Sequence, residues 1–375
     1  MKVAVLLEQL LGPTPGGTGR FARELTAALV EARHADDTLT GWVGRRRDVA
    51  AATLSGVAGP RQLPLPAPAV ARLWPLGLGP SPTGADVVFA PTVLAPPRRR
   101  SGPAVVVAVH DAVPWTAPET QTPHSRRFHR RSIARLARDA DAIVVPTRAV
   151  AQVLPTHVPH LDPARVHVIG EGVSAAVAGT PPDTAVRAAR LALPDRYLLM
   201  VGTFEPRKGI DTAIAALAAP EAPPLPLLLV GQAGWGAVDP VALARGAGLA
   251  PDRVRVLGRL PDADLAVAYG RAAAVLVPSR DEGFGLPVAE AMAHGTPVVV
   301  TDVPALVETA GGAAEVAPVG DPAALAAAAA RAADPARRAT YEAAGREQAR
   351  RHDWSAAADA LWTVLRSVAT NTSQV

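Results

Sequence analysis

The chain has 375 residues, enough for two domains of ordinary size. Its 49% hydrophobic and 19% charged residues are typical of a globular protein, and the absence of cysteine excludes disulfides, thiolate metal sites and cysteine nucleophiles. The net charge is only +4, but residues 1–172 carry 20 basic and 13 acidic side chains, against 18 and 21 in the remainder. This basic first half fits either an acidic acceptor or anionic membrane, or simply solvated arginine faces.

Hydrophobic patterning gives no sign of a membrane span. No apolar run approaches the ~18–20 residues that a bilayer span needs. We therefore expect a cytoplasmic protein, and peripheral contact with the inner face of the plasma membrane stays an open alternative.

Short apolar runs bounded by turn residues predict ten β-strands. The runs are continuous rather than alternating, as in buried parallel strands. Helical segments separate them, which predicts an α/β fold with two doubly wound, Rossmann-like sheets. We expect a first domain over residues 1–173, a linker over 174–195, a second domain over 196–352, and a C-terminal helix and tail over 353–375. The predicted strands are Val3–Leu7, Val87–Phe89, Ala104–Val109, Ala142–Val145, Val166–Ile169, Tyr197–Val201, Leu227–Val230, Val254–Leu257, Val275–Val277 and Pro297–Val300.

A glycine-rich loop follows the first predicted strand. Gly16 and Gly17 lie in this loop, just before a predicted helix over Phe21–Ala32. Glycines at such a position can cradle a phosphate, but their order is not the G-x-G-x-x-G of dinucleotide sites. A plain loop is the alternative.

His110 ends the third predicted strand, so its ring is expected at the carboxyl edge of the first sheet. The alternative is a structural histidine with satisfied hydrogen bonds, followed by Asp111 as a cap. Further on, His124–Arg138 predicts a basic amphipathic helix with Phe128, Ile133 and Leu136 turned inward. Such a helix suits either a phosphorylated lipid acceptor or membrane surface, or a solvated face.

The first strand of the second half ends in a loop with two adjacent cations. Val201–Asp211 contains Gly202, Thr203, Arg207 and Lys208. In open α/β sheets, ligands bind beyond the carboxyl ends of strands. Arginine offers a planar fork for phosphate oxygens and lysine a compact point charge, so this loop is a candidate phosphate site.

The strongest motif is the segment 278–295, which follows a predicted buried strand. Gly283 and Gly285 lack Cβ atoms, so backbone N–H groups there can approach an anion at the N-terminus of the following helix. Glu282 precedes this helix and Glu290 lies about one turn into it, so two carboxylates flank one pocket. In the alternative interpretation, Glu282 acts as a cap and Glu290 is a solvated or paired helix residue.

Two Asp-x-Asp patterns occur, over residues 139–141 and 262–264. Such a pair can hold a divalent metal that bridges a diphosphate. Here one precedes a strand and the other opens a helix, where aspartate caps, so no metal site is predicted.

Together these motifs resemble glycosyltransferase family 4 (group 1), retaining enzymes with the two-domain GT-B fold. The match is most specific for Glu282 and Glu290 and for Val201–Asp211, which is similar to bacterial mannosyltransferase-like members. Gly12–Gly19 and Val109–Asp111 resemble the family's N-terminal motifs more loosely. The resemblance implies two domains facing across a cleft, with the C-terminal helix returning to the first.

The resemblance also implies residue roles. Glu290 would bind the ribose of a nucleotide diphosphate sugar, and Glu282 and His110 would contact its sugar. The diphosphate would be neutralised by Arg207 and Lys208. Further donor contacts are implied for Gly16, Gly17, Gly202, Thr203, Arg259, Leu260, Gly283, Phe284, Gly285 and Leu286. Many members have an arginine where this chain has Thr203, which leaves individual phosphate contacts open.

The resemblance predicts a hexosyltransferase that uses no separate cofactor. GDP-mannose is the favoured donor, and a glycan, a lipid-linked acceptor or a small molecule is the expected acceptor. No nucleic-acid partner is expected. A non-catalytic nucleotide-sugar-binding subunit is the main alternative. A dinucleotide oxidoreductase and a phosphorylase with Lys208 as a Schiff base are further ones.

Overall fold

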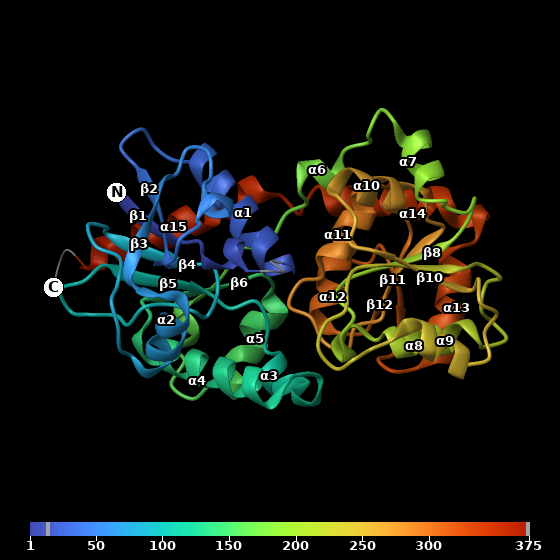
Figure 1. The fold of residues 1–375 in the computed structure, drawn as a ribbon, viewed down its shortest axis with the longest axis horizontal. Helices are drawn as coiled ribbons and strands as arrows, with labels where there is room; N and C mark the ends of the chain where they lie inside the picture. The colour runs from blue at the N-terminus through green and yellow to red at the C-terminus, as the bar shows by residue number, and fades with distance from the viewer. Residues whose placement is uncertain (13–15, 373–375) are drawn as a thin grey trace. The chain divides into compact units, whose positions relative to one another are not determined.

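The computed structural model describes residues 1–12 and 16–372. The chain divides into two compact units, one of residues 1–115, 123–171 and 354–375, the other of residues 116–122 and 172–353. Each unit is built on a parallel sheet (Figure 1), so the predicted pair of doubly wound α/β sheets is confirmed.

The sheet of the first unit has strand order β3-β2-β1-β4-β5-β6-β7. Strands β4, β5 and β6 are buried along their whole length, which explains their unbroken apolar sequences. The strands are β1 (Lys2–Leu6), β2 (Thr38–Arg45), β3 (Ala58–Pro66), β4 (Val87–Ala90), β5 (Ala104–Ala108), β6 (Ala142–Val145) and β7 (Val166–Val168). The helices are α1 (Gly16–Glu31), α2 (Ala67–Leu73), α3 (Val113–Thr116), α4 (Pro123–Asp139), α5 (Arg148–His157) and α15 (Trp354–Thr372).

The second sheet has the order β10-β9-β8-β11-β12-β13. Its strands are β8 (Leu198–Val201), β9 (Leu227–Val230), β10 (Val254–Gly258), β11 (Ala274–Val277), β12 (Val298–Thr301) and β13 (Glu315–Ala317). The helices of this unit are α6 (Ala175–Ala178), α7 (Thr184–Arg190), α8 (Ile210–Leu217), α9 (Pro240–Gly246), α10 (Asp262–Arg271), α11 (Leu286–Ala293), α12 (Pro304–Ala310), α13 (Pro322–Ala332) and α14 (Arg338–Ala349).

Three strands, β2, β3 and β13, were not predicted, because each lacks a continuous apolar run of the expected length. Strand β3 contains three prolines, which a sheet tolerates at an edge, and β3 is an edge strand. Strand β13 is also an edge strand, and it has only three residues, too few for a recognisable apolar run. Strand β2 has two glycines and two threonines, so it lacks a continuous apolar run.

The segment expected as a linker, 174–195, carries helices α6 and α7. Both pack against α10 of the second unit. Arg187 and Arg190 of α7 bind the buried carboxylate of Asp264 at N–O distances of 2.7 and 2.6 Å. These ion pairs attach the segment to the second unit.

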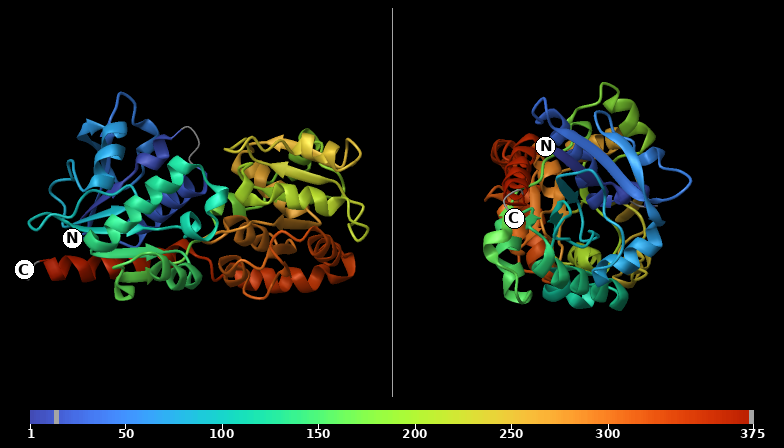
Figure 2. Two further views of the ribbon diagram at one scale, coloured as in Figure 1. Left: turned by 90° about the horizontal axis from the view of Figure 1, so that it is seen from below. Right: turned by 90° about the vertical axis from the view of Figure 1, so that its left-hand side faces the viewer.

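The final helix α15 packs against α1 of the first unit, as the prediction of a returning C-terminal helix requires (Figure 2). Trp362 is fully buried, and its indole N–H donates to the Leu29 carbonyl at 3.1 Å. Arg366 lies over the Trp362 ring and binds Asp37 at 2.9 Å. Helix α15 is therefore held by both packing and charge.

Candidate functional site

The predicted donor residues gather at the carboxyl edge of the second sheet. Strands β8 and β11 are neighbours there although two strands separate them in sequence, so this is the point where the strand order reverses. Crevices at such points are the usual ligand sites of open α/β sheets. The loop with Arg207 and Lys208 follows β8, and the loop with Glu282 follows β11.

A glycine lets these two loops approach each other. Gly209 has a φ of +68°, and a Cβ built on it would lie only 2.0 Å from the Pro278 carbonyl oxygen. The backbone N–H of Arg280 also donates to the Arg207 carbonyl at 2.8 Å. The close contact of the loops places the two cations beside Glu282.

Glu282 is the centre of a buried ion cluster. Its carboxylate oxygens accept from Arg207 Nη1 at 2.7 Å and from Lys208 Nζ at 2.5 Å. Ser279 Oγ donates to the same carboxylate at 2.9 Å. Arg207 additionally binds Glu205 at 2.9 Å. The two predicted phosphate ligands therefore have acidic partners in this structure.

The cluster changes the acidity of Glu282. Burial alone would raise the pKa of its carboxyl group, but the charges of Arg207 and Lys208, with hydrogen bonds from Lys208 and Ser279, outweigh burial and lower the pKa to about 2. Glu282 is thus ionised throughout the physiological range.

Glu290 lies on α11, as predicted, and is only 4% exposed. Tyr269 of α10 donates its hydroxyl to the Glu290 carboxylate at 2.7 Å. The carboxylate is therefore held in a fixed orientation by a neighbouring helix.

The loop that carries Glu282 is anchored by hydrogen bonds to its backbone. Buried Thr301 donates to the Ser279 carbonyl at 2.5 Å, and buried Thr309 donates to the Phe284 carbonyl at 2.7 Å. Gly285, with φ of +92°, is the N-cap of α11, as the motif predicts. A fixed loop is a requirement for a preorganised anion site.

The remaining predicted donor residues of the second unit lie along the same edge of its sheet or in these loops. Gly202 lies directly under the aliphatic part of Lys208, with 3.6 Å between an ideal Cβ and Lys208 Cε. Arg259 and Leu260 follow β10, where Arg259 is exposed. The others are partly buried (Thr203, Leu286) or buried (Gly283, Phe284).

His110 follows β5 at the carboxyl edge of the first sheet, as predicted. Its Nε2 lies 2.8 Å from the Pro91 carbonyl oxygen and its Nδ1 lies 3.7 Å from a carboxylate oxygen of buried Glu171. Burial would lower the pKa of the imidazole, but the contact with Glu171 outweighs burial and raises the pKa. Asp111 accepts from the backbone N–H of Val113, the capping contact of the alternative interpretation.

The glycine loop differs from its prediction. Helix α1 begins at Gly16 rather than at Phe21, so Gly16 and Gly17 form its first turn. The N–H groups of a first turn have no intrahelical acceptors, so they can donate to a ligand. Residues 13–15 of the loop lie outside the described part of the chain.

One aspartate of each Asp-x-Asp pattern binds arginine. Asp264 pairs with Arg187 and Arg190, and Asp141 accepts from Arg98 Nε at 2.7 Å. Across residues 1–12 and 16–372, no group of three or more histidine or acidic side chains is placed to hold a metal ion.

Helix α4 has the predicted amphipathic pattern. Ile133 and Leu136 are buried, and Phe128 packs on the same core. Arg127 and Arg131 are exposed, while Arg126 and Arg130 are partly buried. No helix in the described part of the chain is long and apolar enough to cross a membrane.

Four contact residues escaped the sequence analysis: Glu171, Tyr269, Ser279 and the pair-forming Glu205. None belongs to a spacing pattern that indicates chemistry. Glu171 and Tyr269 are distant in sequence from His110 and Glu290 and reach them only through the fold, whereas Ser279 and Glu205 contact neighbours in their own loops. Ser279 and Glu205 do lie inside the two predicted motifs.

Two family models match the chain and together cover most of it. "Glycosyl transferases group 1" matches residues 183–348, and "Glycosyltransferase Family 4" matches residues 15–177. The chain belongs to these glycosyltransferase families.

Curated relatives of this glycosyltransferase chain match parts of it. O-antigen chain mannosyltransferase B of Escherichia coli is 39% identical over 132 residues, which is 34% of this chain and 34% of that protein. D-inositol 3-phosphate glycosyltransferase of Segniliparus rotundus is 36% identical over 175 residues, 45% of this chain and 38% of that protein. These matches span about a third of the relatives' length.

Solved structures share the fold of this glycosyltransferase chain. Sucrose-phosphate synthase of Thermosynechococcus elongatus has a TM-score of 0.75 at 23% identity, with 98% of both chains covered. HepE of Anabaena, in complex with UDP-glucose, has a TM-score of 0.72 at 21% identity, with 100% of both chains covered.

Proposed function

We propose that this protein is a retaining hexosyltransferase that moves a sugar, with mannose favoured, from a nucleotide diphosphate sugar to a glycan, glycolipid or small-molecule acceptor. The observation that carries the proposal is the pair of adjacent cations, Arg207 and Lys208, at the reversal point of the second sheet, beside the buried carboxylate of Glu282.

The charges that develop in the reaction explain why two cations lie at this position. Breaking the bond between the anomeric carbon and the phosphate oxygen leaves negative charge on the diphosphate and positive charge on the sugar. Arg207 and Lys208 would stabilise the departing diphosphate, and fixed cations do so without reorganising during the reaction. Glu282 holds both cations in place in the structure described here, and the diphosphate would share them on binding.

The other roles follow from the same placement. Glu290, oriented by Tyr269, would accept hydroxyl groups of the donor ribose. The acceptor oxygen would bond to the anomeric carbon on the face that the leaving group vacates, and a diphosphate oxygen would take the acceptor proton.

Mannose is favoured because of the named relatives. The Escherichia coli relatives include O-antigen chain mannosyltransferase B and the serotype-specific mannosyltransferase WbdA. A structural neighbour instead carries UDP-glucose, so the donor panel must include both nucleotides.

A thermal-shift screen against UDP-, GDP-, ADP- and dTDP-sugars tests the donor. A sugar nucleotide at ~100 times its Kd stabilises the protein by ~2.7 kcal/mol, and GDP-mannose is the expected ligand. If no sugar nucleotide shifts the melting temperature, the proposal is wrong.

Catalysis is tested by transfer of radiolabelled sugar in Lys208→Ala. Transfer should fall by ~10²–10³ because one preorganised charge partner of the leaving group is lost. Arg280→Ala is the matched control, since Arg280 lies on the adjacent loop and pairs with half-exposed Asp211. Donor binding without turnover on any acceptor would instead favour the non-catalytic binding subunit.

A further inference from the structure

A large pocket lies in the first unit, away from the predicted donor residues. Its volume is about 1330 Å³, which exceeds the ~300–1,000 Å³ of ordinary small-molecule sites. The pocket runs past Met1, Asp86 and Pro103, residues that immediately precede β1, β4 and β5. His110 and Gly16 lie instead beyond the carboxyl ends of strands.

Hydrogen bonds within the unit fix the loops that form the pocket wall. Trp74 donates its indole N–H to the Pro80 carbonyl at 2.9 Å. Arg99 Nη2 donates to the Gly79 carbonyl at 3.0 Å, and Arg98 Nη1 donates to the Gly102 carbonyl at 3.1 Å. The space between these loops is therefore held open by the fold.

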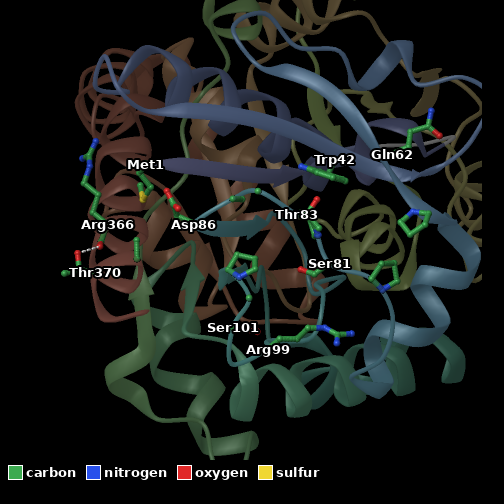
Figure 3. A pocket seen from close by; sticks show the side chains of 18 residues that line it. Met1, Trp42, Gln62, Ser81, Thr83, Asp86, Arg99, Ser101, Arg366 and Thr370 are labelled. Atoms are coloured by element: carbon green, nitrogen blue, oxygen red, sulfur yellow. Dashed lines mark hydrogen bonds between the residues drawn. The ribbon is translucent and has the colours of Figure 1, made fainter. Parts of the chain in front are cut away.

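One polar group that lines the pocket has no hydrogen-bond partner among the described residues. Trp42 is 7% exposed and lines the pocket, as Figure 3 shows. Within the described part of the chain, its indole N–H makes no hydrogen bond, and the nitrogen atom is not fully enclosed by protein. The N–H is therefore accessible from the pocket and can donate to an acceptor atom of a ligand.

Hydroxyl groups surround the same space. Ser81, Thr83 and Ser101 line the pocket (Figure 3), and none of their hydroxyls bonds to another described residue. Each hydroxyl can both donate and accept. Prolines supply apolar surface between them, among them Pro64 and Pro82.

The charges of the pocket already have partners. Arg366 binds Asp37 at 2.9 Å, Arg99 donates to Gly79, and Asp86 accepts from the backbone N–H of Lys2 at 2.7 Å. Arg99 keeps its positive charge beside the Gly79 carbonyl, but the Asp86 carboxylate lines the same pocket and would oppose an anionic ligand such as a nucleotide. The lining instead suits a neutral ligand with many hydroxyl groups and apolar C–H faces.

We propose that this pocket binds a neutral oligosaccharide, with the Trp42 indole N–H donating to a sugar oxygen. The choice of a glycan that also serves as the acceptor rests on the proposed function, whereas oligosaccharide binding does not. The pocket would then hold a part of the acceptor chain remote from the reacting end.

Titration calorimetry without nucleotide tests the proposal, with neutral hexasaccharides of mannose, glucose and galactose as probes. At least one should bind saturably to the full chain. Ser101→Trp places a large side chain in the pocket from an exposed position and should weaken binding at least tenfold. Trp42→Phe, which keeps an aromatic ring but removes the N–H, should weaken it about threefold to tenfold.

Ser55→Trp is the matched control, because Ser55 is exposed in a turn and does not line the pocket. Equal affinity of Ser101→Trp and Ser55→Trp, or no saturable binding of any hexasaccharide at millimolar concentration, would overturn the proposal. The outcome is independent of the donor screen: oligosaccharide binding should persist in Lys208→Ala, whose transfer is lost.

Discussion

Replacing Glu282 with glutamine isolates the contribution of the buried ion cluster. In the folded chain the pKa of Glu282 is about 2, against an ordinary value of 4.5. The difference corresponds to about 3 kcal/mol of stability. Because Arg207 and Lys208 are 19% and 16% exposed, glutamine leaves two largely buried cations without their shared carboxylate.

The pH dependence follows from the direction of the pKa shift. A carboxyl group with a lowered folded pKa stabilises the fold fully above its unfolded pKa, and loses this effect as the pH falls toward the folded pKa. Glu282→Gln should therefore be about 3 kcal/mol less stable than wild type at pH 7. The difference should shrink between pH 5 and pH 2, because the Glu282 carboxylate of the unfolded chain takes up a proton there while that of the folded chain stays ionised down to about pH 2.

Urea unfolding of the second unit at pH 7, 5, 4 and 3 measures this difference. Asp211→Asn is the control, because Asp211 pairs with Arg280 at the surface and such pairs contribute only ~0–1 kcal/mol. A loss of stability in Glu282→Gln that is the same at every pH would refute the reasoning. So would a loss no larger than that of Asp211→Asn.

Three further substitutions test the remaining contacts. Glu171→Gln should lower the pKa of His110 in an NMR titration, because Glu171 favours the protonated imidazolium. The stability that this contact adds is lost as the pH rises through the raised pKa of His110. An unchanged pKa of His110 in the variant would contradict this. Gly209→Ala should destabilise the second unit by ~1–3 kcal/mol in urea because of its positive φ and a clash with a carbonyl, whereas Gly246→Ala, with open space around it, should not. Trp362→Ala should cost ~3–5 kcal/mol in the unfolding of the first unit, and a loss below 1 kcal/mol would show that α15 is not needed there.

The sequence alone determined the fold class, because buried parallel strands must be continuously apolar. All ten predicted strands are present, including β6 and β9 with their exact bounds. The sequence did not predict β3 and β13. Both are edge strands, and an edge strand needs no continuous apolar run and tolerates proline. The start of α1 at Gly16 was not predicted because glycine is a poor helix former.

For the candidate site, the sequence supplied the residue types, since the motifs after β8 and β11 carry their own spacing. Only the tertiary structure decided the partners. Glu282 pairs with both cations, Glu290 accepts a hydrogen bond from Tyr269, and His110 lies beside Glu171. These pairs join residues 21 to 75 positions apart. Spacing along the chain specifies local geometry, whereas the strand order of each sheet specifies which loops meet. That order depends on how all the strands pack and cannot be predicted from any one segment.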